Sequence, residues 1–127
     1  MFKVIVLIKR QPHLTHEEFA EKWRADGTIE YWRTLHGKEG DPGIMENVVR
    51  FAQNFPRLDL LPAGTPGGYD GIVEIWYKSE EAMKASIDNE YYRNILRPDE
   101  LKYIDLSASA KFILEENVVV DHEAGIV

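Results

Sequence analysis

Two acidic residues lie on a predicted strand that is otherwise apolar. Residues 69–77 follow a loop rich in proline and glycine and are dense in β-branched and aromatic side chains, which is typical of an interior strand. Because side chains alternate along a strand, Asp70 and Glu74 share a face and lie roughly 13 Å apart, too far to share a proton. Burial would raise the pKa of Glu74 and make it a useful base, whereas a lysine or arginine across the sheet would keep it ionised. Asp70 could equally stabilise a turn.

Histidine is the other candidate for acid–base chemistry near neutral pH. The chain has four histidines, of which His36, at the end of the first predicted helix, is the catalytic candidate. Stabilisation of a helix end by the imidazole is the alternative for this residue. His13 and His16 are three apart, but His13 precedes the helix, so we expect no metal site there. His122 lies in a charged tail and is expected to be solvated.

Polar side chains on a second predicted strand, residues 47–55, suit a carbonyl substrate. Asn54 could polarise the carbonyl and Arg50 could hold an enolate or carboxylate. Hydrogen bonding at the end of the strand and a surface ion pair are the alternatives. Aromatic side chains at helical spacing are more often core residues, yet their number here suits a pocket for a planar, partly apolar molecule. We therefore predict Asn54, together with His36, Asp70 and Glu74, as catalytic. The predicted substrate-binding residues are Trp23, Tyr31, Arg50, Trp76 and Tyr91.

Length and composition exclude several classes of protein. The chain of 127 residues is long enough for one domain, spanning residues 1–127. A formal charge of −7 argues against nucleic acid as a partner. There is no cysteine, no phosphate-binding glycine loop and no nucleophile elbow, so we expect no metal and no cofactor. Without an apolar run of membrane-spanning length or a secretory leader, we expect a soluble cytoplasmic protein with no membrane partner.

The first half of the chain predicts a strand followed by a capped helix. Residues 2–8 form a nearly continuous Val/Ile-rich run, as in a central strand covered on both sides. Thr15 and Glu18 form a capping box, and Leu14 and Phe19 are placed to pack across it, so the helix begins at His16. Gly27 is the predicted break point, because glycine costs about 1 kcal/mol against alanine inside a helix.

The remaining pattern predicts a ferredoxin-like α+β fold of order β-α-β-β-α-β. Residues 56–68 form a long connection, a helix runs from Ser79 to about Ile87, a second helical piece starts at Pro98 and continues through Leu101 and Ile104, and residues 111–120 form the last strand. Right-handed crossovers place the helices on one face of a four-stranded antiparallel sheet. The other face would expose an apolar patch, so we expect an obligate homodimer formed by sheet-to-sheet packing.

The order of motifs resembles the EthD family of the dimeric α+β barrel superfamily over nearly the whole chain. The matching motifs are Leu14-Thr15-x-Glu17-Glu18-Phe19-x-x-x-Trp23, Arg50-Phe51-x-Gln53-Asn54, Tyr69-Asp70-Gly71-Ile72-x-Glu74-x-Trp76, Pro98-Asp99-Glu100-x-x-x-Ile104-Asp105 and Glu115-Glu116. The family commonly has a histidine four residues after the helix tryptophan, where this chain has Gly27, so the resemblance puts a mechanism through that imidazole in doubt.

The resemblance implies a dimeric α+β barrel and a cofactor-independent lyase that acts by proton transfer on a small aromatic or polyketide-like substrate. Dehydratase, cyclase and isomerase chemistry all fit this expectation. A superfamily-type oxidoreductase, either a cofactor-free or a haem-using monooxygenase, is one alternative. A non-catalytic protein that binds a small hydrophobic molecule is the other.

Overall fold

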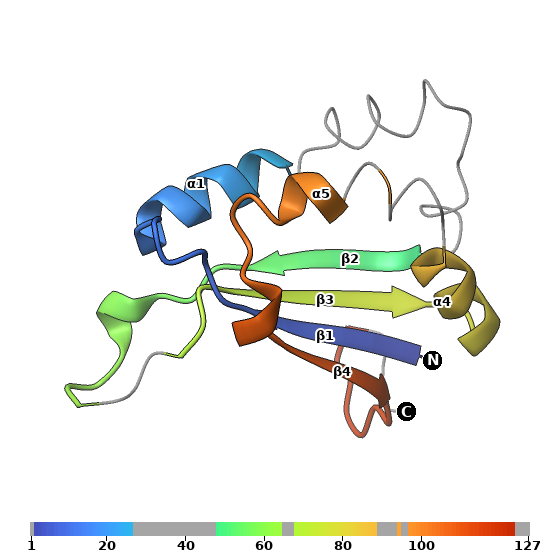
Figure 1. The fold of residues 1–127 in the computed structure, drawn as a ribbon. Helices are drawn as coiled ribbons and strands as arrows, with labels where there is room; N and C mark the ends of the chain where they lie inside the picture. The colour runs from blue at the N-terminus through green and yellow to red at the C-terminus, as the bar shows by residue number, and fades with distance from the viewer. Residues whose placement is uncertain (1, 27–47, 65–67, 89–93, 95–96, 124–127) are drawn as a thin grey trace.

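The computed structural model describes residues 2–26, 48–64, 68–88, 94 and 97–123. They form a four-stranded antiparallel sheet of order β2-β3-β1-β4, with α1 and α5 over one face and α4 beside the end of β3 (Figure 1). The strands are β1 Phe2–Ile8, β2 Val48–Asn54, β3 Gly71–Tyr77 and β4 Ala110–Glu115. The helices are α1 His16–Asp26, α4 Glu80–Ile87 and α5 Arg97–Glu100, and the 3-10 turns are η1 Leu58–Leu60 and η3 Leu106–Ala108. This is the ferredoxin-like arrangement that the order of elements predicts.

The strand register divides the sheet into two chemically different faces. On the covered face, which meets the helices, Val4 lies opposite Ile75, and Val6 opposite Val73. On the other face, which we call the open face, Ile5 pairs with both Glu74 and Phe112. The remaining open-face side chains are Lys3, Leu7, Arg50, Ala52, Asn54, Ile72, Trp76, Ala110 and Leu114. The open face is therefore apolar at β4 and polar where β1, β2 and β3 meet.

The start of α1 is the one predicted from its capping box. The Thr15 backbone N–H donates to Glu18 Oε1 at 3.0 Å, and the Glu18 backbone N–H donates to Thr15 Oγ1 at 3.1 Å. These bonds satisfy N–H groups that have no partner inside the helix. Leu14 and Phe19 are both buried in the same core cluster. The sequence signal and the observed start at His16 agree.

The core on the covered face is built around Trp23. Its ring lies 5.7 Å from that of Phe19 and 5.0 Å from that of Phe55, measured between centroids. The Gln53 side-chain amide donates to the Trp23 carbonyl at 2.8 Å, which ties α1 to β2. A Cβ at Gly71 would lie 2.6 Å from the Trp23 ring. The indole therefore packs directly on the backbone of β3, a contact that only glycine permits.

Two predicted elements end earlier than expected. The predicted last strand, residues 111–120, is β4 Ala110–Glu115, because Glu115 already pairs with Phe2, the first residue of β1. The helical piece predicted through Leu101 and Ile104 stops at Glu100. The backbone after it pairs with the connection between β1 and α1, since Ile104 bridges to Arg10. The strand therefore ends where its partner ends, and the segment after α5 pairs with a distant part of the chain.

Candidate functional site

A group of charged and polar side chains occupies the centre of the open face. We call it the open-face cluster, and it comprises Lys3, Arg50, Asn54, Glu74, Trp76 and Glu116. Glu74 lies at its middle, with Oε2 2.7 Å from Lys3 Nζ and Oε1 accepting a hydrogen bond of 3.0 Å from the Asn54 amide. The Lys3 and Glu74 side chains are only 15% and 25% exposed, so solvent screens this ion pair weakly. Residues from β1, β2 and β3 therefore hold one carboxylate in a fixed position.

Trp76 presents its ring between two cations. Lys3 Nζ lies 4.4 Å from the ring centroid and the Arg50 guanidinium carbon lies 4.6 Å from it. The indole N–H donates to Glu116 at 3.2 Å. Within the described part of the chain, no hydrogen bond uses the Arg50 guanidinium, which lies on a largely exposed residue. Trp76 is only 9% exposed, so the Arg50 side chain is the part of this pair that an anionic or carbonyl group can reach.

Of the two alternatives for Glu74, the ion pair across the sheet determines its pKa, which is lowered even though burial alone raises it. The hydrogen bond from Lys3 lowers the pKa of Glu74, and this effect outweighs desolvation; the Lys3 charge and the Asn54 hydrogen bond lower it further. The same pairing raises the pKa of Lys3. Glu74 is therefore ionised at neutral pH, as the alternative of a cross-sheet ion pair requires.

Asn54 is already saturated as a donor. Its side-chain nitrogen donates to Glu74 and also, at 3.0 Å, to the carbonyl of Ile72. An amide has two N–H donors, so Asn54 orients Glu74 in this state and has no donor left for a substrate carbonyl.

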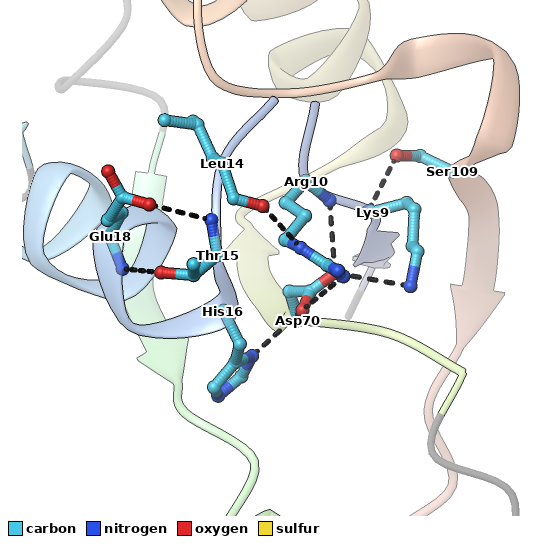
Figure 2. Close-up of polar contacts among 8 residues, drawn as sticks. All are labelled: Lys9, Arg10, Leu14, Thr15, His16, Glu18, Asp70 and Ser109. Atoms are coloured by element: carbon cyan, nitrogen blue, oxygen red, sulfur yellow. Dashed lines mark hydrogen bonds and ion pairs between the residues drawn. The ribbon is translucent and has the colours of Figure 1, made fainter. Parts of the chain in front are cut away.

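Asp70 belongs to a second polar group at the end of the sheet. We call it the sheet-end cluster, and it comprises Lys9, Arg10, His16 and Asp70 (Figure 2). Asp70 is 3% exposed. Its Oδ1 lies 2.8 Å from His16 Nδ1, and its Oδ2 accepts the backbone N–H of Arg10 at 3.1 Å. Lys9 Nζ lies 3.6 Å from Oδ2, and Arg10 Nη1 lies 3.4 Å from Oδ1. Three basic side chains thus surround one buried carboxylate.

The neighbours of Asp70 keep its carboxylate ionised. Burial by itself raises the pKa of Asp70, but the Arg10 backbone N–H, the His16 hydrogen bond and the charges of Lys9 and Arg10 together lower it below the ordinary value. An ionised carboxylate only accepts hydrogen bonds, so His16 Nδ1 carries the proton of the shared bond. The sequence pattern did not select His16. The pairing of Ile8 with Gly71 could have found it, because that register brings the residues after β1 beside Asp70.

The other predicted site residues do not join either cluster. Trp23 is 4% exposed in the core on the covered face, opposite to the face of Trp76, so one substrate cannot contact both rings within one chain. His36, Tyr31 and Tyr91 lie outside the described residues, as does Gly27. Their predicted roles stay predictions.

Asp26 is a titratable residue that the sequence pattern did not single out. It ends α1, where a negative charge is disfavoured by the helix dipole. Burial raises the pKa of Asp26, the negative charge of Asp99 raises it further, and a hydrogen bond from the Tyr103 side chain opposes the shift. A carboxyl of this kind is a second candidate for proton transfer on the covered side of the sheet.

The described part of the chain has neither a cluster of metal ligands nor a membrane-spanning helix. Among residues 2–26, 48–64, 68–88, 94 and 97–123, no group of three or more histidine, aspartate or glutamate side chains is placed to hold a metal ion. None of the helices described in these ranges combines the length and the apolar character needed to cross a bilayer.

Comparison with known proteins places this geometry among related folds. The family model described as EthD domain matches residues 11–107. No curated protein matches the chain. The chain is similar to the solved structure of At3g17210 from Arabidopsis thaliana, with 16% identity, a TM-score of 0.61, and coverage of 94% of this chain and 98% of that one.

Two further solved structures share the fold. A dimeric protein of unknown function and ferredoxin-like fold from Bacteroides fragilis is 10% identical, with a TM-score of 0.57, and covers 91% of this chain and 95% of its own. A structure described as an antibiotic biosynthesis monooxygenase is 11% identical, with a TM-score of 0.53, and covers 93% of this chain and 100% of its own. At these identities the likeness concerns the fold alone.

Proposed function

The chain belongs to the EthD domain family, and from that premise we propose that it is a cofactor-independent enzyme of the dehydratase, cyclase or isomerase type. Its substrate would be a small aromatic or polyketide-like carbonyl compound, on which it transfers a proton. One observation carries the proposal: Arg50, Asn54, Glu74 and Trp76, selected from the sequence for carbonyl chemistry, lie together on the open face.

Each side chain has a role that follows from its contacts. Trp76 is only 9% exposed, so its ring supports the Arg50 guanidinium from below, and that guanidinium binds the oxygen that becomes negative when an adjacent C–H is deprotonated. Glu74 is ionised and accepts that proton. Lys3 and Asn54 fix the direction of its oxygens. The lowered pKa makes Glu74 a weaker base than an isolated buried carboxyl, so orientation and the charge of Arg50 must supply much of the rate.

A homodimer is part of the same proposal. Phe112 and Leu114 on the open face are 48% and 37% exposed, and an apolar face of this kind is commonly covered by a partner. Packing the open faces of two copies together would shield the open-face cluster from water and leave a hollow beside Trp76. The similar Bacteroides fragilis protein is dimeric, which supports a homodimer. Light scattering that finds a stable monomer at micromolar concentration would contradict it.

Exchange of substrate protons with deuterated water tests the chemistry directly. A panel of small aromatic and polyketide-like ketones is incubated with the protein, and loss of the proton next to the carbonyl is followed by NMR. We expect Arg50→Met and Glu74→Gln to slow exchange about tenfold or more. Arg24→Met is the matched control, because Arg24 also stacks on an aromatic ring, that of Phe55, but away from the open face.

The same experiment separates the alternatives. Exchange that is unchanged in Arg50→Met, Asn54→Ala and Glu74→Gln would rule out the open-face site. Oxygen consumption on substrate addition would favour the monooxygenase alternative. Saturable binding without exchange or oxygen consumption would favour a binding protein.

A further inference from the structure

The sheet-end cluster contains an arrangement that the proposed function does not use. His16 is the first residue of α1, and its side chain is 21% exposed, whereas Asp70 beside it is almost completely buried. The imidazole points away from the other side chains of the cluster, and only its Nδ1 edge faces Asp70 (Figure 2). One edge of the ring is therefore anchored on a buried carboxylate, and the side chain as a whole is partly exposed.

The tautomer of His16 follows from its partner. Asp70 is held as an acceptor by the Arg10 backbone N–H and by two cations, so the hydrogen bond of 2.8 Å requires a proton on Nδ1. In a neutral imidazole the proton then lies on Nδ1 and the lone pair on Nε2. In the part of the chain that the structure describes, no hydrogen bond to Nε2 is found. The Glu18 carboxylate is turned to the Thr15 backbone N–H.

From this geometry we propose that His16 and Asp70 form an acid–base pair in which His16 Nε2 takes a proton from the O–H of a small phenol or enol. The O–H bond breaks, its electron pair stays on oxygen as a phenolate or enolate, and the proton forms an N–H bond at Nε2. Return of the proton from the imidazolium to carbon or oxygen completes the cycle. Asp70 acts through His16 as a positioning residue.

The imidazolium formed by the transfer is the charge that contacts the new anion, and Lys9 and Arg10 lie against Asp70, farther from Nε2. Before proton transfer, the positive charges of Lys9 and Arg10 already exceed the single negative charge of Asp70, in a chain whose formal net charge is −7. Protonation of His16 adds one more positive charge beside the new oxyanion. Asp70 compensates part of this charge from the buried side, as the carboxylate does in an Asp–His pair that stabilises imidazolium.

The inference is independent of the open-face proposal, because the two clusters share no residue. Asp70 lies just before β3 and Glu74 lies within it, four residues apart, which in extended backbone is roughly 13 Å. Variants of Arg50 and Glu74 test the open-face site, and variants of His16 and Asp70 test the sheet-end cluster.

4-Nitrophenol is a suitable probe, because ionisation of its hydroxyl produces the yellow phenolate. At slightly acidic pH, titration with the native protein is expected to increase phenolate absorbance saturably. His16→Gln is expected to weaken this response about tenfold or more, the amount expected for losing a hydrogen bond to a charged group. The matched control is His13→Gln, because His13 is an exposed histidine just before the helix. An equal response in native protein and His16→Gln would overturn the proposal.

NMR of the histidine ring nitrogens tests the tautomer on which the proposal depends, while the phenolate response tests the proton transfer itself. We expect the neutral His16 ring to carry its proton on Nδ1 in the native protein and to lose this preference in Asp70→Asn. Circular dichroism checks that each variant is folded. If Asp70→Asn does not fold, the NMR spectrum of the native protein and the phenolate response of His16→Gln still test the proposal. A neutral His16 ring with its proton on Nε2 in the native protein would refute the acid–base pair.

Discussion

Replacing Gly71 with alanine tests the packing on which the covered side of the sheet depends. An added Cβ would lie 2.6 Å from Trp23 Cζ3 and 2.9 Å from Cε3. Carbon atoms in contact normally lie 3.5–4.0 Å apart, so the ring, the helix or the strand must move by about 1 Å. The ring cannot tilt freely, because Phe19 stacks on it and Phe55 lies against it.

The loss of stability in Gly71→Ala follows from this lack of room for a Cβ. Overpacking a well-filled core costs about 1–3 kcal/mol, and an aromatic ring held by two others places Gly71→Ala in the upper part of that range. For a domain of this size, about 2–3 kcal/mol corresponds to a fall in Tm of roughly 10 °C. Without the clash, alanine would stabilise the protein by about 0.4–1 kcal/mol, because it restricts the unfolded chain. The steric clash in the folded state is larger than this gain, so the variant is expected to be less stable.

Urea unfolding at one fixed protein concentration measures the change, since a dimer would make stability depend on concentration. Gly68→Ala is the matched control, because a Cβ there would meet nothing within 4 Å. The double variant Gly71→Ala with Trp23→Leu should lose less than the sum of the two single variants, because removing the ring removes the clash. A Gly71→Ala protein as stable as Gly68→Ala would refute the reasoning.

Two carboxyls are expected to affect stability with opposite dependence on pH. The folded-state pKa of Asp70 is lowered. Its contribution to the free energy of unfolding is therefore present above the ordinary aspartate pKa of about 4 and is lost as pH falls through the folded-state pKa. In urea unfolding, the stabilities of the native protein and Asp70→Asn should converge toward acid pH, and a constant difference would contradict this. The pKa of Asp26 is raised by burial, so its ionisation weakens the fold as pH rises through that range. Asp26→Asn should therefore gain stability relative to the native protein from acid to neutral pH, and a constant difference would disprove it.

Signals confined to one segment predicted the fold well. The bounds of β1 follow from its continuous apolar run, and the start of α1 follows from Thr15 and Glu18, which contact each other three residues apart. The ends of β4 and α5 were predicted too late because they depend on partners about a hundred residues away. Glu115 meets Phe2, and Ile104 meets Arg10. A sequence pattern within one segment does not reveal which distant residues the segment will pair with.

The candidate site was predictable to the extent that strand alternation determines it. Alternation alone placed Asn54 and Arg50 on one face of β2, and Glu74 and Trp76 on one face of β3. Only the β2–β3 register, with Ala52 opposite Glu74, brings the two faces together and makes Asn54 a diagonal neighbour of Glu74. The protonation state of Glu74 needed the position of Lys3, on yet another strand.

Glu74 and Asp70 are both ionised, but their hydrogen-bond partners differ. This difference decides which group accepts the proton in each proposed site. Lys3 and Asn54 both donate to Glu74, so neither relays a proton onward, and a proton that Glu74 removes stays on Glu74 itself. Asp70 has a partner with a second nitrogen, so a proton can go to His16 while Asp70 stays ionised. A rate that falls only in strongly acid solution would indicate Glu74, whose pKa is lowered. A rate that falls near neutral pH would indicate an imidazole, and its loss in His16→Gln but not in His13→Gln would assign that imidazole to the sheet-end cluster.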